Sequence, residues 1–135
     1  MKAFVCVDDG FGMAFLGKRQ SRDTRVLEDI ISTASKTLVY MTAQTKKLFP
    51  DTDLAVASPI TDSLLATDEY YFFETESPLG YLDAVDEIVL YRWNRRYPAD
   101  LKLGFLPSES GYTRVSVTEF VGTSHDCITK EVYKK

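Results

Sequence analysis

The residues best suited to ligand chemistry lie near the start of the chain and in its last third. Asp23 opens an amphipathic stretch, where a carboxylate can either bind the paired donors of a planar heterocycle or cap a helix. Arg19 and Arg95 carry guanidinium groups, which suit bidentate recognition of phosphate or carboxylate. Phe11 and Trp93 are candidates to stack on a planar ligand, with core packing as the alternative. These residue types predict a site for a small planar or nucleotide-type ligand.

Other groupings favour structural roles. Ser124, His125 and Asp126 are consecutive, and successive side chains of an extended strand point to opposite faces. These three residues therefore cannot form a hydrogen-bonded relay among themselves, and a structural histidine is the preferred interpretation. Asp8 and Asp9 could bind a metal with Glu74, but aspartates that open a loop usually stabilise turns, so no metal site is predicted.

The composition limits the class of protein. The chain has 135 residues, a net charge of −4 and a sequence pI near 5.0, so no global positive field attracts nucleic acid. Its two cysteines form no disulfide framework, and we see neither a secretory leader nor an apolar run of the ~20 residues that span a membrane. We therefore expect one cytoplasmic domain over residues 1–135, with no membrane partner and nucleic acid an unlikely one; the sequence leaves a homo-oligomer open.

The hydrophobic pattern predicts the elements that position these residues. The apolar run at 3–7 predicts a strand buried on both faces, and a loop follows it. Helical spacing predicts a helix that begins at Ser21 or Asp23 and continues to Ala34. Strands are expected over 37–41, 54–57, 70–73 and 87–93, with short helices over 42–49, 61–66 and 77–85 between them.

Three further strands, over 101–106, 113–120 and 128–133, follow without helices. The fold class is therefore α/β, a doubly wound sheet with an antiparallel C-terminal edge. In such sheets ligands bind at the carboxyl ends of the parallel strands, where Asp23 and the loop after the first strand are expected.

Several stretches resemble the dihydrofolate reductase family. Val7-Asp8-Asp9-Gly10-Phe11-Gly12-Met13, followed by Asp23, resembles its opening strand, Gly-Met loop and acidic helix residue. The stretch from Gly111 to Phe120 resembles its Trp-x-x-Val-Ser-x-Glu strand, and Ser124 to Tyr133 is similar to its C-terminal pattern. The resemblance implies a dihydrofolate reductase-like fold over nearly the whole chain. It also adds Met13, Gln20 and Thr45 to the expected ligand-binding residues.

The departures from this family fall on the cofactor. Its Met-Gly-Arg-x-Thr turn, which holds phosphates of NADPH, reads Met41-Thr42-Ala43-Gln44-Thr45 here. Its second, glycine-rich phosphate turn is replaced by residues 72–77, which place Glu74 and Glu76 where a pyrophosphate would lie. Repulsion between like charges makes standard NADPH binding doubtful, and the cofactor stays unknown.

The chain also resembles short bacterial proteins that carry the label ribonuclease Z. Enzymes of that name hold two zinc ions with a cluster of histidines, whereas this chain has His125 alone. We therefore set that activity aside.

The sequence thus predicts a divergent dihydrofolate reductase-like protein that binds a small planar or nucleotide-type ligand without standard NADPH-dependent reduction. The alternative is an oxidoreductase of reductase descent with an altered cofactor or substrate. Whether the protein is an enzyme stays open, as do the ligand, the oligomeric state and the pathway. The expected ligand-binding residues are Asp23, Arg19, Gln20, Phe11, Met13, Thr45, Trp93 and Arg95.

Overall fold

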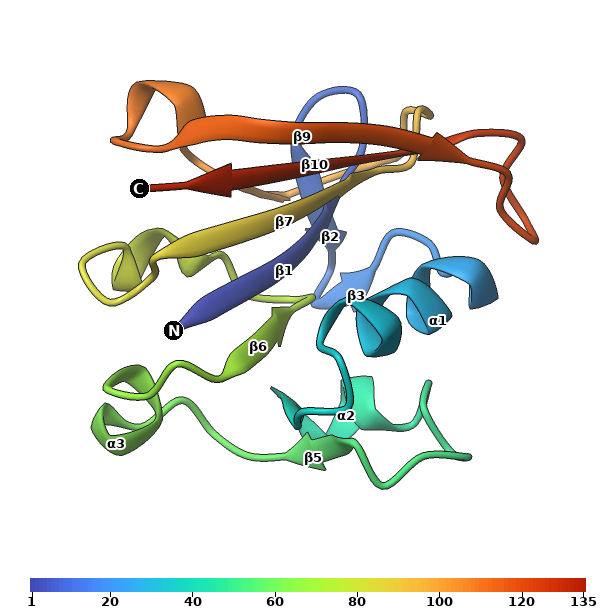
Figure 1. Cartoon of the computed structure of the whole chain (residues 1–135). Coiled ribbons are helices and arrows are strands. Elements are labelled where there is room, and N and C mark those ends of the chain that lie inside the picture. Colours follow the sequence, from blue (N-terminus) through green and yellow to red (C-terminus); the bar gives the residue numbers. More distant parts are fainter.

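The first strand, β1 (Lys2–Val7), lies in the middle of a seven-stranded sheet in the computed structural model, which describes residues 1–135 (Figure 1). It pairs in parallel with β6 (Tyr70–Phe73) on one side and with β7 (Glu87–Arg92) on the other. All its side chains from Ala3 to Val7 are buried. A strand covered on both faces needs an uninterrupted apolar run, and this is why the sequence predicted it.

The order of the strands in this sheet is β5-β4-β6-β1-β7-β10-β9. The short strands β4 (Val39–Met41) and β5 (Ala55–Ala57) continue the parallel part. The last two strands, β9 (Thr113–Phe120) and β10 (Ile128–Lys134), are antiparallel, with β10 paired to β7. The predicted α/β sheet with an antiparallel C-terminal edge is confirmed.

Helices cover both faces of the sheet, as expected. On one face α1 (Thr24–Thr33) packs Val26 and Ile30 against the even-numbered residues of β1. On the other face α3 (Asp62–Leu65) and the 3₁₀ helix η1 (Pro78–Tyr81) contribute to a second core with the odd-numbered residues of β1. No helix is long and apolar enough to cross a membrane.

The loop expected after β1 is instead largely a hairpin of β2 (Gly12–Phe15) and β3 (Lys18–Arg19). It forms a three-stranded sheet with β8 (Leu101–Lys102). Leu16 and Gly17 join the strands with φ angles of 51° and 73°, and positive φ at both central residues defines the tight turn that suits a hairpin. Leucine seldom adopts this conformation, so no residue pattern at 12–19 predicts a hairpin.

Two predicted helices and one predicted strand are shorter than expected. The helix predicted over 42–49 is only α2 (Ala43–Lys46), capped by Thr42, whose hydroxyl accepts a hydrogen bond from the Thr45 N–H. The helix predicted over 77–85 is the single 3₁₀ turn η1, which contains Gly80, a weak helix former. The strand predicted over 101–106 ends after β8, and η2 (Pro107–Glu109) follows.

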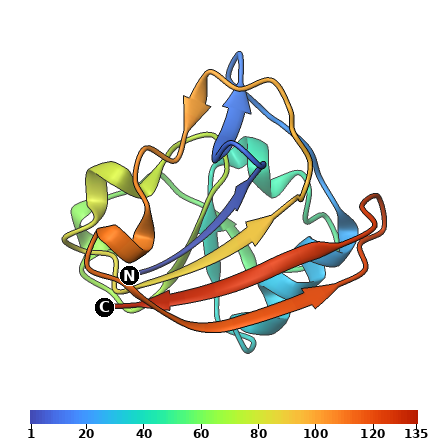
Figure 2. The same ribbon diagram turned by 90° about the horizontal axis from the view of Figure 1, so that it is seen from above.

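The two ends of the sheet differ in what they carry. Figure 2 shows the N- and C-termini side by side at one end of the molecule. At the opposite end the loop between β9 and β10 reaches the start of α1, and the backbone N–H of Thr123 in this loop bonds the side chain of Asp23. The carboxyl ends of the parallel strands face this second end, where the fold places the candidate site.

Two adjacent isoleucines of α1 test how the helix is held on the sheet. Ile30 is fully buried, whereas Ile31 is half-buried. Ile30→Ala should lower the free energy of unfolding by about 2–5 kcal/mol, and Ile31→Ala by clearly less, because only the first substitution leaves a closed cavity. Urea unfolding of both variants measures this difference, and equal losses would contradict the packing described here.

Candidate functional site

Asp23 is a buried carboxylate whose partners all belong to the protein itself. It is the N-cap of α1, and its Oδ1 accepts from the backbone N–H groups of Arg25 and Thr123, both at 2.9 Å. Its Oδ2 accepts from the Ser124 N–H at 2.7 Å and lies 2.9 Å from Nδ1 of His125. A carboxylate has about four acceptor positions, and all four are used. In this conformation Asp23 has no acceptor position left for a ligand.

The charge of Asp23 is strongly stabilised. Burial by itself would raise the pKa of this carboxyl group. The hydrogen bonds from His125 and from the three backbone N–H groups outweigh that effect and lower the pKa from 3.8 to about 2. The carboxylate is therefore ionised throughout the physiological range and serves as a fixed negative charge under the start of α1.

His125 is held on several sides. Its ring stacks on Trp93 with 4.6 Å between the ring centroids and 23° between the planes. A carboxylate only accepts hydrogen bonds, so Nδ1 carries the proton that bonds Asp23, and Nε2 of a neutral ring is an acceptor. Two hydroxyl groups lie near this nitrogen, Oγ of Ser21 at 3.0 Å and the phenol oxygen of Tyr97 at 3.1 Å. Trp93, expected as a stacking platform for a ligand, is buried and stacks on this histidine.

Asp8 fixes the loop that follows β1. Its Oδ1 accepts from the N–H groups of Gly10 and Gly12, and its Oδ2 from the N–H of Tyr97 and from Nε2 of Gln20. Burial opposes ionisation, but these hydrogen bonds outweigh it and lower the pKa of Asp8. The structure contains no group of three His, Cys, Asp or Glu residues that could hold a metal ion.

Arg19 and Thr45 meet at Glu74, which follows β6. Nε of Arg19 lies 2.8 Å from Oε2 of Glu74, and the hydroxyl of Thr45 donates to Oε1 at 2.9 Å. The Glu74 side chain is only 8% exposed. Instead of standing as an isolated negative charge in the crevice, Glu74 is neutralised by Arg19 and joins β3, α2 and the end of β6.

Two hollows both border Lys18 and Arg19. The polar hollow has a volume of about 590 Å³ and is lined by Gly17, Lys18, Arg19, Gln44 and Thr75. The aromatic hollow has a volume of about 300 Å³ and is lined by Phe15, Leu16, Lys18, Arg19, Gln20, Tyr97 and Pro98. The two hollows thus share Lys18 and Arg19 as a common wall.

Gln20 lines the aromatic hollow with one polar atom unused. Its Nε2 donates to Oδ2 of Asp8 at 3.2 Å and to the carbonyl oxygen of Pro98 at 3.3 Å. Its Oε1 is buried and has no hydrogen-bond partner. A buried acceptor without a donor costs free energy, so a side-chain movement that gives this atom a donor would be favourable.

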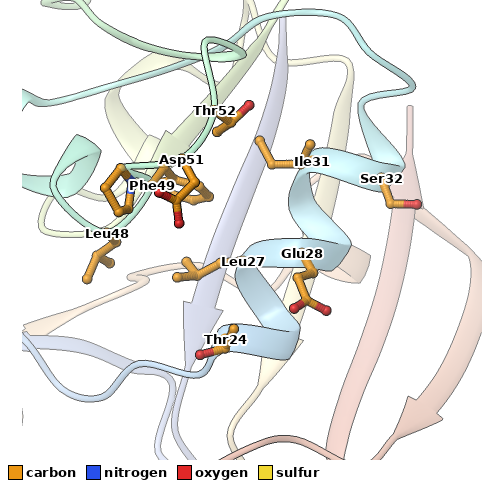
Figure 3. Close-up of a pocket in the computed structure, with 10 residues that line it drawn as sticks. Thr24, Leu27, Glu28, Ile31, Ser32, Leu48, Phe49, Asp51 and Thr52 are labelled. Carbon is orange, nitrogen blue, oxygen red and sulfur yellow. The ribbon is translucent and has the colours of Figure 1, made fainter.

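A third hollow, the α1 groove, has a volume of about 430 Å³ and contains none of the predicted site residues (Figure 3). Leu27 and Ile31 point from α1 toward the segment that carries Leu48 and Phe49. Its lining residues are Thr24, Leu27, Glu28, Ile31, Ser32, Leu48, Phe49, Pro50, Asp51 and Thr52. Hydrophobic spacing along α1 gave the inner face of this groove, but the opposite wall comes from a segment some twenty residues further on.

The other predicted residues lie apart from the two hollows that share Lys18. Met13 is buried in the core on one face of the sheet. Phe11 packs against the same core, and the guanidinium of Arg92 lies 4.8 Å from the centre of its ring. Arg95 is exposed. The structure therefore groups Arg19, Gln20 and Thr45, and separates them from Phe11, Met13 and Arg95.

Sequence reasoning missed the partners of these residues. Glu74 lies 55 residues from Arg19, and Ser21 lies 104 residues from His125. No local spacing indicates pairs at such separations. Tyr97 was not among the predicted site residues, whereas its hydroxyl contacts both Ser21 and His125.

Comparison with known proteins supports the fold. No protein-family model matches the chain, and no curated protein matches it either. Among solved structures, it is similar to a dihydrofolate reductase from Enterococcus faecalis complexed with NADP(H) and RAB-propyl. The TM-score is 0.68 at 13% sequence identity, covering 98% of this chain and 94% of that one. The protein therefore has a dihydrofolate reductase-like fold.

Asp23→Asn tests the electrostatic role of the buried carboxylate. Because its folded-state pKa of about 2 lies below the ordinary 3.8, ionised Asp23 stabilises the fold at neutral pH. That contribution, about 2 kcal/mol from a shift of nearly two pKa units, is lost as the pH falls from about 4 to about 2. An asparagine can still cap α1, but its amide nitrogen cannot accept from both Ser124 and His125.

We expect the free energy of unfolding of Asp23→Asn to be lower than that of the wild type by about 2 kcal/mol or more at pH 7. The difference should shrink as the pH falls from 4 to 2. Urea unfolding across this range measures it, with Asp126→Asn as a control because Asp126 is exposed. A difference that does not depend on pH would contradict the assignment.

Proposed function

We propose that the protein binds a small planar ligand with an anionic group, of nucleotide type, across the polar and aromatic hollows, and that it does so without standard NADPH-dependent reduction. The observation that carries this proposal is the shared wall of Lys18 and Arg19 between the two hollows. A ligand with a flat apolar end and a charged end fits such a pair of neighbouring environments.

The polar hollow suits the anionic end. Lys18 is exposed there without an ion-pair partner, and Gln44 and Thr75 add polar side chains. No carboxylate is among its lining residues, and the nearby Glu74 is already paired with Arg19. An ammonium group among neutral polar side chains favours a phosphate or carboxylate.

The aromatic hollow suits the planar end. Phe15, Leu16, Tyr97 and Pro98 provide an apolar wall, and aromatic rings stack well on heterocycles. Gln20 also lines this hollow, and a movement of its side chain would present the buried, unpartnered Oε1 to a ring N–H or amino group. A base or a pterin-like ring has both the flat surface and such a donor.

Standard NADPH binding is disfavoured by the residues at the crevice. The similar reductase is complexed with NADP(H). Here Ala43 stands where the family carries an arginine, and Glu74 and Glu76 stand in place of the glycine turn. Without that glycine turn the backbone N–H groups have no close approach to a pyrophosphate.

Two variants that each remove one lysine charge test the anion site. Binding of mononucleotides and folate would be measured by thermal shift and calorimetry on the wild type, Lys18→Gln and Lys36→Gln. Both lysines are exposed, but only Lys18 lines the hollows. Lys18→Gln should weaken binding of the preferred compound about 2- to 10-fold at low salt and less at high salt, since salt screens the exposed ammonium. Lys36→Gln should bind like the wild type. Equal losses in the two variants would overturn this site.

For NADPH we expect no appreciable binding. Millimolar NADPH should leave the melting temperature almost unchanged, because stabilisation follows RT ln(1 + [L]/Kd) and vanishes for a weakly bound ligand. A differential scanning measurement with and without NADPH checks this. A rise of several degrees, or oxidation of NADPH that depends on dihydrofolate, would support an oxidoreductase instead.

A further inference from the structure

Three residues from distant parts of the chain form a hydrogen-bonded line. Oγ of Ser21 lies 3.0 Å from Nε2 of His125, and Nδ1 of His125 lies 2.9 Å from Oδ2 of Asp23. Ser21 and Asp23 lie just before the first residue of α1, and His125 comes from the loop between β9 and β10. Each contact uses the atom that a serine–histidine–aspartate relay requires.

The histidine in this line is fixed in the tautomer that a general base needs. Its Nδ1 proton bonds the ionised Asp23, so Nε2 presents its lone pair to the hydroxyl of Ser21. Stacking on Trp93 prevents the ring from turning away. Asp23 itself is held by three backbone N–H groups, so the positioning carboxylate cannot swing out of line.

We propose that Ser21 is the nucleophile of an acyl-transfer site, with His125 as general base and Asp23 as positioning residue, and that the site hydrolyses small carboxylic esters that carry a negative charge. Ser21, His125 and Asp23 line neither hollow of the proposed ligand site, and the two sites have only Tyr97 in common.

The step balances with water as the only co-reactant. Oγ of Ser21 bonds to the ester carbonyl carbon while its proton moves to Nε2 of His125. The bond from that carbon to the leaving oxygen then breaks, and the departing alcohol takes the proton from Nε2. Water next adds to the acyl carbon and gives a proton to Nε2, and the bond to Ser21 breaks as Oγ recovers that proton.

Tyr97 can stabilise the charge that develops on the carbonyl oxygen. Its hydroxyl lies 3.1 Å from Nε2 and 3.4 Å from Oγ of Ser21. Nε2 has one lone pair, so when Ser21 donates to it the phenol donates instead to Oγ of Ser21 at 3.4 Å, a long hydrogen bond that a stronger acceptor can replace. A substrate carbonyl bonded to Ser21 would place its oxygen within reach of this donor.

The surroundings of Ser21 indicate the substrate class. Ser21 is half-buried, and its neighbours in the chain, Gln20 and Arg22, line two different hollows. The hollow on the Arg22 side has a volume of about 400 Å³, with the cations Arg22 and Lys47 and the apolar Leu27, Leu48 and Pro50 among its lining residues. The one carboxylate in its lining is Asp23, whose acceptor positions are filled. A short acyl chain that ends in a carboxylate fits this environment.

A fluorophosphonate probe tests the nucleophile directly, because it forms a bond to an activated serine Oγ with loss of fluoride. The full-length wild type should take up about one probe per chain, and peptide mass spectrometry should locate it on Ser21. Ser21→Ala should lose the label, whereas Ser63→Ala should keep it, since Ser63 is an exposed serine of α3. His125→Phe keeps a ring to stack on Trp93. Its labelling rate should be lower than that of the wild type by about 100-fold or more.

Turnover supplies the second measurement. Hydrolysis of mono-4-nitrophenyl glutarate, which is anionic, should exceed that of 4-nitrophenyl acetate at low salt, and the preference should fall as salt is added. Tyr97→Phe should lower turnover about 100-fold while the melting temperature stays near that of the wild type. Circular dichroism of every variant establishes that it is folded.

Wild type that takes up no label, label that persists in Ser21→Ala, or label on another residue would each overturn the proposal. A purely structural network predicts altered melting temperatures with no covalent reaction. Because the ligand site is tested by Lys18→Gln binding and this site by covalent labelling, failure of one leaves the other standing.

Discussion

A charge removed from water must find donors inside the protein, and at Asp23 this requirement organises one whole end of the fold. Its four hydrogen bonds come from the first turn of α1 and from three consecutive residues of the loop between β9 and β10. The loop must approach closely, and a Cβ at Gly122 would collide with the carboxylate. Removing any donor would leave a buried charge under-compensated, so this end of the sheet is held in one arrangement.

The charge of the crevice at the ends of β1 and β6 depends on another carboxylate, Glu74, whose side chain is 8% exposed. Taken alone, its negative charge repels an anionic ligand, but Arg19 and Thr45 satisfy it. The ion pair with Glu74 partly neutralises the positive charge of Arg19. Lys18 is then the unpaired cation on the wall that the two hollows share. The net charge that a ligand meets in the crevice therefore depends on which charged side chains are paired with each other. It does not follow from the residue types alone.

How far the sequence predicts this structure depends on the range of the interactions involved. The strands at 3–7 and 70–73 follow from runs of apolar residues, and the N-cap role of Asp23 follows from its neighbours along the chain. The hairpin at 12–19 is not predictable in this way, because the turn between β2 and β3 places Leu16 at a positive φ that leucine seldom adopts, and β2 pairs with the distant β8. The same limit applies to the candidate site: the sequence named Arg19 and Thr45, but their shared partner Glu74 lies far along the chain.

The similarity to a reductase at 13% identity fixes where the carboxyl ends of the strands meet, and so where a ligand is expected, but it does not fix the chemistry there. An acidic residue just before α1 can accept hydrogen bonds either from a ligand or from groups of the protein itself. Here its oxygens are committed to the chain itself, so it has no lone pair for a heterocycle. It acts on its surroundings through His125 instead, and the reactive groups nearest that histidine are the hydroxyls of Ser21 and Tyr97. In the acyl-transfer site that we propose, this carboxylate orients His125 and does not contact the substrate.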